Sequence, residues 1–433
     1  MASQQNWYKL DNVAKIIPSS VEGADTRVFR LTCELKETVD PVLLQTALER
    51  TLPEFPYMSC CLRRGIFWYY LDTCDEYPAV CADNRPALEA LYVAGQKNLL
   101  FRVSYFERRI NLEMFHVLSD GTGGFVFLTH VLTHYLSDKY NLPFETLAQD
   151  VSSADEKTAD AFRHFYEGRR EQKKNNHVRV RRNFMKEMFP DRAYQIRGEK
   201  DENLQQHLIE GTVPTDKLLE AAHKYEVTIG VFCTAVYVEA MLTQMSVREK
   251  RRPIVVSVPV NLRQFFPSAT TRNFFGAIQI VYNPERYNGT LESVLSEVKR
   301  LFAENLTEEK IFGTMNSYAA LEHNYAVKMT PLFLKWPAIH SYNFWMKTGV
   351  TTSVSNLGRI ELPDELAKYV DSFSAFMSGR TAFLCISTFR DKTVFGAATC
   401  FTRHAVFMRF FRRLVQMGIP VEIATNDYDV EAD

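Results

Sequence analysis

The sequence lacks the segments by which a chain is exported or held in a membrane. Its first residues, MASQQNWYKLDNV, contain no basic start followed by an apolar run, which is the pattern of a secretory signal peptide. No window approaches the roughly 18 consecutive apolar residues that are needed to span a bilayer. We therefore expect a cytoplasmic protein without a transmembrane segment.

Metal-binding cysteine motifs are also missing. The eight cysteines are scattered apart from the pair Cys60–Cys61, and neither CxxC nor HExxH occurs, which disfavours structural zinc and favours a reducing compartment. His130 and His134 have the spacing at which two imidazoles reach one metal ion. They share their helix face with Thr133 and Ser137, and no nearby acid or cysteine completes a ligand set. We expect an exposed polar face there and no metal site.

An excess of one charge is absent as well. The chain has 51 Lys and Arg against 52 Asp and Glu, so its net charge of −1 gives no general attraction to nucleic acid or to an anionic membrane. We expect no nucleic-acid partner. The basic run RREQKKNNHVRVRR at 169–182 is the main local exception, and it is either a solvated linker or a local anion site.

The length and the order of elements predict two halves. A chain of 433 residues exceeds the roughly 100–200 residues of one domain. Residues 27–35 read as a strand, and Asp40 with Pro41 supplies the cap and first turn of a helix. The same order returns at 205–225, where a strand-like run, a proline and a helical spacing follow one another. We expect an α/β protein of two related halves, each a mixed β-sheet with helices.

These patterns also predict the boundaries of the halves. We assign 1–145 to the N-terminal half, 146–200 to a basic linker or crossover, and 201–433 to the C-terminal half.

The segment FHVLSDGTGG, residues 115–124, joins the strand INLEMFH to the helix GGFVFLTHVLTHYL. A strand, a glycine-rich turn and a helix is the arrangement of a dinucleotide fold, which requires G-x-G-x-x-G. Gly121 and Gly123 fit its first two glycines, but Val126 occupies the third position, and no P-loop pattern occurs. A phosphate cradle is therefore disfavoured.

His116 stands at the end of that strand, with Asp120 in the loop that follows. A neutral imidazole accepts a proton near pH 7, and a strand end beside a glycine turn gives it both exposure and rigidity. Taken alone, a histidine near apolar residues is more often a structural group than a catalytic one.

The stretch His116-Val-Leu-Ser-Asp120-Gly121 resembles the HxxxDG motif of the chloramphenicol acetyltransferase-like superfamily, which includes condensation domains, plant acyltransferases and microbial alcohol acetyltransferases. Many members carry a second histidine directly before the motif, where this chain has Phe115. That difference argues more against a condensation domain than against catalysis, so the chain looks closest to bacterial alcohol acetyltransferases and condensation-domain-like proteins.

Two further segments carry the resemblance. PVNLRQFFPSATTRNFFG at 259–276 is similar to the family's arginine-containing strand end, which makes Arg263 the implied structural partner of Asp120. TSVSNLG at 352–358 is similar to the strand whose serine faces the reacting carbonyl. This similarity assigns Ser355 to catalysis, and it places Asn356 and Gly358, together with Gly121 of the motif, in the lining of the site.

The resemblance implies acyl transfer from a thioester to a hydroxyl acceptor in a tunnel between the halves. His116 would take the acceptor proton and Ser355 would donate to the oxyanion. No cofactor would be bound permanently, because acyl-CoA would be a co-substrate. Arg251 and Arg252, in the run REKRR before the strand that leads to Arg263, are candidates for its phosphates.

Two alternatives stay open. One is a condensation or release enzyme that takes its acyl group from a carrier protein and accepts an amine or an alcohol. The other is a catalytically silent binding module that keeps the same fold. Covalent catalysis by serine has no support, because the G-x-S-x-G pattern is absent.

Overall fold

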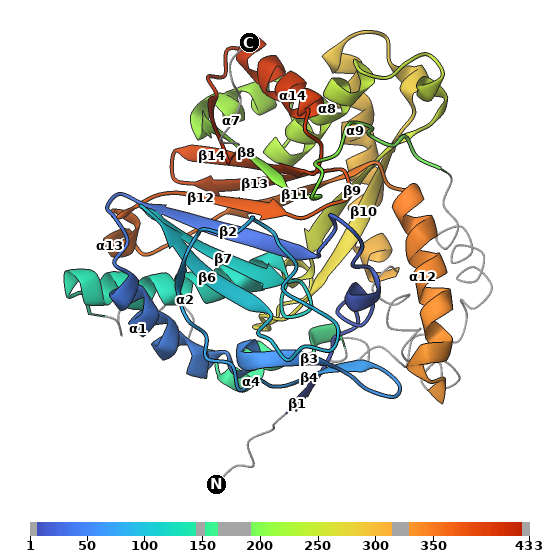
Figure 1. Ribbon diagram of the computed structural model, residues 1–433. Helices are drawn as coiled ribbons and strands as arrows, with labels where there is room; N and C mark the ends of the chain where they lie inside the picture. The colour runs from blue at the N-terminus through green and yellow to red at the C-terminus, as the bar shows by residue number, and fades with distance from the viewer. Residues whose placement is uncertain (1–6, 144–151, 163–191, 314–328, 427–433) are drawn as a thin grey trace.

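The structure is a computed structural model that describes residues 7–143, 152–162, 192–313 and 329–426. Figure 1 shows two layers of sheet, one in each half of the molecule, with helices on their outer faces. Each half has its own core of buried apolar side chains. The predicted α/β architecture with two sheet-and-helix halves is confirmed.

The N-terminal sheet has five strands in the order β12-β2-β7-β6-β5. Its pairs are antiparallel except for β5 with β6, so the sheet is mixed. The strands are β12 (Val370–Met377), β2 (Val28–Leu35), β7 (Arg109–Phe115), β6 (Phe101–Phe106) and β5 (Cys81–Ala82). A small second sheet contains β1 (Trp7–Lys9), β4 (Tyr69–Thr73) and β3 (Cys60–Arg64).

Two helices cover the outer face of this half, α1 (Pro41–Thr51) and α2 (Gly121–Tyr140). The cap predicted for α1 is present, because the side chain of Asp40 accepts hydrogen bonds from the N–H groups of Val42 and Leu43.

The C-terminal sheet has seven strands in the order β10-β9-β11-β13-β14-β8-β15. It is also mixed, because β11 runs parallel to β9 and β13 while the other pairs are antiparallel. The strands are β10 (Phe275–Tyr282), β9 (Ile254–Asn261), β11 (Thr352–Arg359), β13 (Ala382–Phe389), β14 (Lys392–Thr399), β8 (His207–Pro214) and β15 (Glu422–Thr425).

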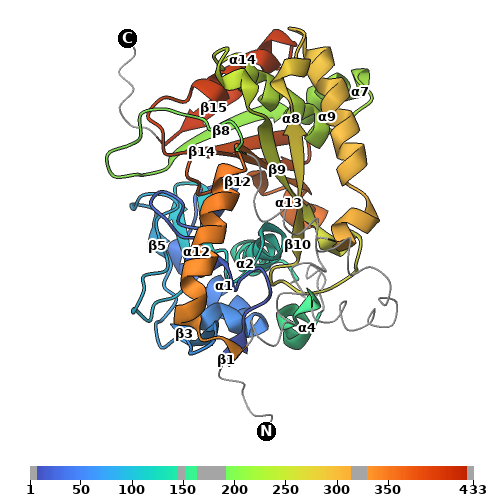
Figure 2. The same cartoon turned by 90° about the vertical axis from the view of Figure 1, so that its right-hand side faces the viewer.

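Helices α7, α8, α9 and α14 cover this sheet, whereas α12 runs beside both halves (Figure 2). The remaining elements are short helical turns. The helices are α7 (Thr215–Lys224), α8 (Ile229–Leu242), α9 (Leu291–Asn305), α12 (Leu332–Thr348), α14 (Ala405–Gln416), α4 (Ala154–Thr158), α13 (Asp364–Ala367), η1 (Ile17–Ser19), η2 (Leu52–Glu54), η3 (Pro56–Ser59), η5 (Glu249–Arg251), η6 (Leu262–Gln264) and η7 (Pro284–Arg286).

One strand does not follow the expected division of the chain. β12 comes from the segment 201–433, yet it pairs with β2 in the N-terminal sheet from Val370 to Met377. In Figure 1 it lies between the two layers. The C-terminal segment therefore contributes one strand to the N-terminal sheet, and a boundary at residue 201 does not separate the two sheets.

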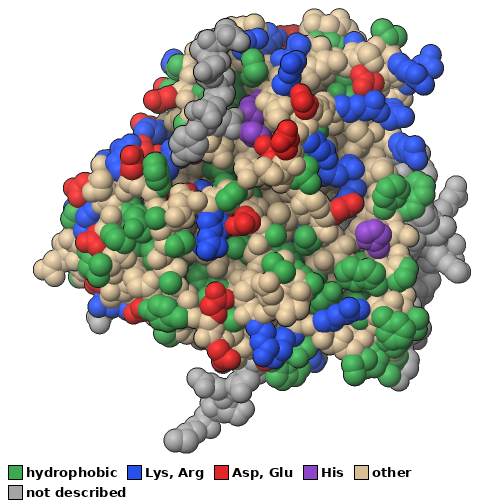
Figure 3. Space-filling view, viewed as in Figure 1, with side chains coloured by type: hydrophobic (Ala, Val, Ile, Leu, Met, Phe, Trp, Pro, Cys, Tyr) green, Lys and Arg blue, Asp and Glu red, His purple; other side chains and the backbone are tan. Residues whose placement is uncertain are grey.

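Acidic and basic side chains are interspersed on the face of the molecule that Figure 3 shows. No single helix of the described segments is long and apolar enough to cross a bilayer; only the bent pair α7–α8 passes that test of length and composition.

Candidate active site

His116 lies directly after β7, at the junction of the two halves. Its backbone N–H donates to the carbonyl of Arg27, which precedes β2, at 2.9 Å. The imidazole is half-buried between Phe29 of β2 and Phe275 of β10, each with its ring centre 5.3 Å away. One aromatic residue from each sheet therefore fixes the position of the histidine ring.

Asn273 determines which nitrogen of His116 carries the proton. Its side-chain Oδ1 lies 2.9 Å from His116 Nδ1. Its amide nitrogen donates to the carboxylate of Asp11 at 3.1 Å and to the carbonyl of His116 at 3.0 Å, which leaves Oδ1 as an acceptor. Nδ1 is thus the protonated nitrogen, and Nε2 keeps its lone pair.

Burial lowers the pKa of His116 below its ordinary value of 6.5. The negative charge of Asp120 and the hydrogen bond to Asn273 oppose this effect without reversing it. The imidazole is consequently neutral at pH 7, which is the state a general base requires.

Asp120 has no free oxygen for the imidazole. Its Oδ1 caps α2 by accepting from the N–H of Gly123 at 2.8 Å, and its Oδ2 accepts from Arg263 Nη1 at 2.9 Å and from the N–H of Phe274 at 2.8 Å. Both partners of the ion pair are largely buried, with side-chain exposures of 13% for Arg263 and 7% for Asp120. The pair that the motif implied is present, and it joins the N-terminal half to the C-terminal half.

The glycines of the loop are required for close packing. A Cβ atom at Gly123 would lie 1.9 Å from the backbone oxygen of Thr271, so no other residue fits at this position. A Cβ atom at Gly121 would lie 2.8 Å from the side chain of Leu357, which has some freedom to move. Gly123, which the sequence reasoning did not assign, is therefore the more constrained of the two.

Phe115 stands where many members of the superfamily have a second histidine. Its side chain is fully buried in the N-terminal core and stacks on Tyr92, with ring centres 5.6 Å apart. This position therefore offers no polar group to the site.

Ser355 and Asn356 lie on opposite faces of β11. Val354 belongs to the core beneath the C-terminal helices, and Asn356 packs on the same side, next to Gly230 at the start of α8. Ser355 is half-buried and points the other way, on the face that carries Leu357 to the start of α2. The structure thus places Ser355, but not Asn356, on the side of the N-terminal half.

Gly358 lies within β11, at the irregularity where the pairing with β13 shifts register between Asn356 and Arg359. It has a positive φ of +76°, and its N–H donates to the side chain of Asn356 at 3.0 Å. Both residues shape the end of the strand, and neither has a recorded contact with His116.

Arg251 and Arg252 are exposed and lie at the far end of β9 from Arg263. A strand of eight residues rises by roughly 26 Å, so this basic run and Arg263 are separated by about the length of β9. Such a separation remains compatible with coenzyme A, because its pantetheine arm separates the thioester from the phosphates. The second basic run, 169–182, lies outside the described residues.

The expected exposed face at His130 and His134 is also wrong. Glu54 of η2 contacts both rings, with Oε2 at 2.8 Å from His130 Nδ1 and Oε1 at 3.3 Å from His134 Nε2. Burial alone would raise the pKa of Glu54, but the two histidines and Lys157 lower it well below its usual range. This cluster links α2 to η2, and its imidazoles are buried at His130 and half-buried at His134 rather than exposed.

Comparisons with known proteins were made at the level of sequence and of structure. No family model matches the chain, and no curated protein matches it either. Solved structures match over nearly the whole chain, at identities too low for any conclusion beyond the fold.

Three of these structures have related architectures. Polyketide synthase associated protein 5 from Mycobacterium tuberculosis matches at 12% identity and a TM-score of 0.61, over 97% of this chain and 98% of that one. The first condensation domain of the calcium-dependent antibiotic synthetase, solved with a substrate analogue, matches at 13% identity and a TM-score of 0.65, over 96% of each chain. The TRI3 trichothecene 15-O-acetyltransferase from Fusarium sporotrichioides matches at 11% and 0.59, over 96% of each.

The protein therefore has the two-half fold shared by chloramphenicol acetyltransferase-like acyltransferases and condensation domains. The resemblance drawn from the HxxxDG motif predicted this fold, and the full-length matches confirm it.

Proposed function

We propose that the protein is an acyltransferase that moves an acyl group from acyl-CoA to a hydroxyl acceptor, with His116 as the general base. The observation that carries this proposal is the hydrogen bond between His116 Nδ1 and Asn273, because it leaves Nε2 as a proton acceptor at the junction of the halves.

The reaction uses no covalent enzyme intermediate. The acceptor oxygen attacks the thioester carbonyl while its proton passes to His116 Nε2, which forms a tetrahedral oxyanion. Collapse of that intermediate breaks the carbon–sulfur bond, and the imidazolium returns its proton to the leaving thiolate. The products are an ester and free coenzyme A.

Two other residues have supporting roles in this proposal. The Ser355 hydroxyl donates to the oxyanion, for which its half-buried position on the inner face of β11 is suitable. Asp120 acts through structure, because both of its oxygens are already bonded within the loop and to Arg263.

The test is a screen of alcohols and amines with acetyl-CoA, in which acetylated products are identified by mass spectrometry. Coenzyme A release is measured by chromatography, because the protein has eight free cysteines that would react with a thiol reagent. His116→Ala should lower turnover by at least ~10²-fold with the fold intact. His223→Ala is the matched control, because His223 is exposed on α7.

Each outcome of the screen supports or excludes one of the candidate functions. Turnover in His116→Ala equal to that of the wild type would contradict the mechanism. Use of an acyl-loaded carrier protein with no use of acetyl-CoA would replace the coenzyme A proposal by a carrier-dependent condensation. No transfer from either donor would favour the silent binding module.

A further inference from the structure

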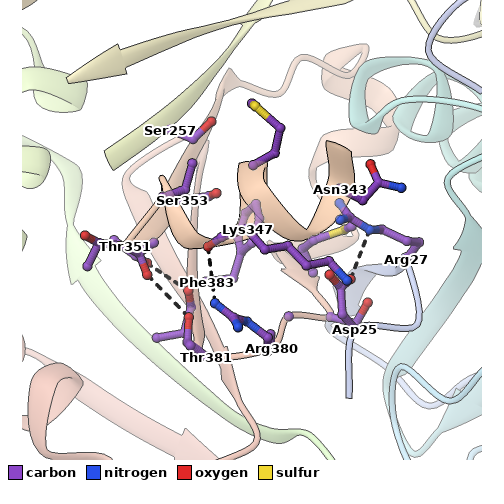
Figure 4. Close-up of a pocket in the computed structure, with 17 residues that line it drawn as sticks. Asp25, Arg27, Ser257, Asn343, Lys347, Thr351, Ser353, Arg380, Thr381 and Phe383 are labelled. Atoms are coloured by element: carbon purple, nitrogen blue, oxygen red, sulfur yellow. Dashed lines mark hydrogen bonds and ion pairs between the residues drawn. The ribbon is translucent and has the colours of Figure 1, made fainter. Parts of the chain in front are cut away.

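A small cavity is lined by Arg27, Ser353 and Arg380, among other residues (Figure 4). Its volume is about 280 Å³. Its walls come from the loop before β2, the middle of β9, the start of β11, the β12–β13 turn and the end of α12. The lining is divided about evenly between polar and apolar atoms, and its polar part includes the charged side chains of Arg27, Lys347 and Arg380.

The cavity adjoins the reacting atoms through two residues of its lining. Arg27 contributes its side chain to the wall, while its backbone carbonyl accepts the hydrogen bond from the N–H of His116 at 2.9 Å. Ser353 also lines the cavity and lies on the same face of β11 as Ser355, two residues along the strand. A molecule held here by one end would therefore place its other end near His116.

The backbone at Arg27 is unusual. Its φ is +57°, in the left-handed region that residues with a side chain rarely adopt. Such conformations persist only where the surroundings enforce them, and they concentrate at functional sites. Here one residue provides both a support for His116 and a cation for the cavity wall.

The cationic groups of the cavity exceed the acidic groups that pair with them. Arg27 Nε lies 3.1 Å from Asp25 Oδ1, and Lys347 Nζ lies 2.8 Å from Glu22 Oε2. These two cations are each matched by one carboxylate.

Arg380 is the third cation. Its Nη2 donates to Gln195 Oε1 at 2.6 Å and to the carbonyl of Lys347 at 3.2 Å, both of which are uncharged. Within the described segments no carboxylate forms an ion pair with Arg380. The cavity therefore holds one positive charge in excess.

The geometry of Arg380 indicates what would balance that charge. Both of its recorded hydrogen bonds use Nη2, so Nη1 and Nε have no partner among the residues that the structure describes. The Nε–H points away from Nη1, so each of these two groups can donate a separate charge-assisted hydrogen bond to a carboxylate or a phosphate. The side chain is half-buried, which reduces screening of such a contact by salt.

We propose that this cavity binds the anionic group of the acyl acceptor, a carboxylate or a phosphate, with Arg380 as its principal contact. This inference rests on the proposed acyl transfer. The phosphates of coenzyme A are separated from the thioester by the whole pantetheine arm, so they do not belong in a cavity that adjoins His116. An acetyl chain is uncharged, so it would leave the positive charge of Arg380 without a partner.

The test compares acceptors that differ only in charge. With acetyl-CoA as donor, lactate is compared with lactamide, and glycerol phosphate with glycerol. We expect kcat/KM to be roughly tenfold to hundredfold higher for the anionic member of at least one pair. Arg380→Gln should raise KM for that anion by a similar factor and leave the neutral partner unchanged. Arg390→Gln is the matched control, because Arg390 is exposed in the β13–β14 turn and pairs with Asp364.

Three results would overturn the proposal while leaving acyl transfer in place. The first is equal kcat/KM for both members of each pair. The second is an Arg380→Gln variant whose KM rises for acetyl-CoA rather than for the acceptor. The third is a preference for succinyl-CoA over butyryl-CoA that Arg380→Gln abolishes, which would assign the anionic group to the acyl donor.

A binding measurement keeps the cavity testable if no acceptor is acetylated at all, in which case the proposed function itself fails. Saturation-transfer NMR with lactate and glycerol phosphate is performed on the wild type and on Arg380→Gln. A signal that the variant loses supports the anion site independently of turnover. No signal for either anion at millimolar concentration overturns it.

Discussion

Asp120→Asn is the substitution that best separates the structural role of the HxxxDG motif from its chemistry. Asparagine caps a helix about as well as aspartate, so the bond to the N–H of Gly123 is kept. What changes is the other oxygen, which accepts from Arg263 at 2.9 Å and from the N–H of Phe274 at 2.8 Å. If the amide nitrogen takes that place, it faces two donors and leaves Arg263 without a counter-charge.

The expected cost follows from burial. With only 13% and 7% of the two side chains exposed, Arg263 and Asp120 form a largely buried pair. Breaking such a pair by removing one charge costs ~3–5 kcal/mol. Asp120→Ala should cost about 1 kcal/mol more, because it also removes the helix cap.

The assay is urea unfolding of the wild type and the variant, followed by two probes to check that the transitions coincide. Asp138→Asn is the matched control, because Asp138 is on the same helix and pairs with Arg50 at 2.7 Å. The side chain of Arg50 is 53% exposed and that of Asp138 is 26% exposed. An exposed pair of this kind contributes at most about 1 kcal/mol. If Asp120→Asn costs no more than Asp138→Asn, the proposed structural role of Asp120 is refuted, whatever happens to the activity.

The remaining predictions concern the reaction. Because burial lowers the pKa of His116, kcat/KM should rise with pH through an apparent pKa below 6.5 and stay level above neutrality; a midpoint above 6.5 would contradict the neutral imidazole. Ser355→Ala should lower kcat by ~10²–10³-fold with little change in KM, and an unchanged kcat would remove Ser355 from the oxyanion site. The double substitution Arg251→Ala with Arg252→Ala should raise KM for acyl-CoA and leave kcat unchanged, and the wild-type KM should rise with ionic strength. If KM changes with neither the substitution nor the ionic strength, this basic run does not bind acyl-CoA.

The sequence predicted what depends on local pattern. Hydrophobic periodicity and capping or turn residues determine such elements. Three of them are confirmed: the strand at 27–35, the capped helix after Asp40 and the strand–loop–helix around His116. The pairing of Asp120 with Arg263 was reachable only through the resemblance, since 143 residues separate the partners.

Other parts of the site depend on contacts that no local pattern reveals. Asn273 joins His116 to Asp11, and 262 residues separate Asn273 from Asp11 in the chain. The environment of His134 on α2 was not predictable for the same reason, because the acid that contacts it is Glu54, 80 residues earlier. The constraint at Gly123 is likewise set by a backbone oxygen from the other half.

The strand β12 bears on how this chain can be divided in the laboratory. A fragment that ends near residue 201 would lose β12, so the whole length of β2 would present unpaired N–H and C=O groups to solvent. Exposed edges of this kind pair with other chains. The fragment would also lose Phe373 and Phe376 of β12 from the N-terminal core, which would uncover neighbours such as Phe125. The N-terminal fragment should therefore aggregate when produced alone, and a synthetic peptide covering Val370–Met377 should restore its solubility by taking the vacant edge.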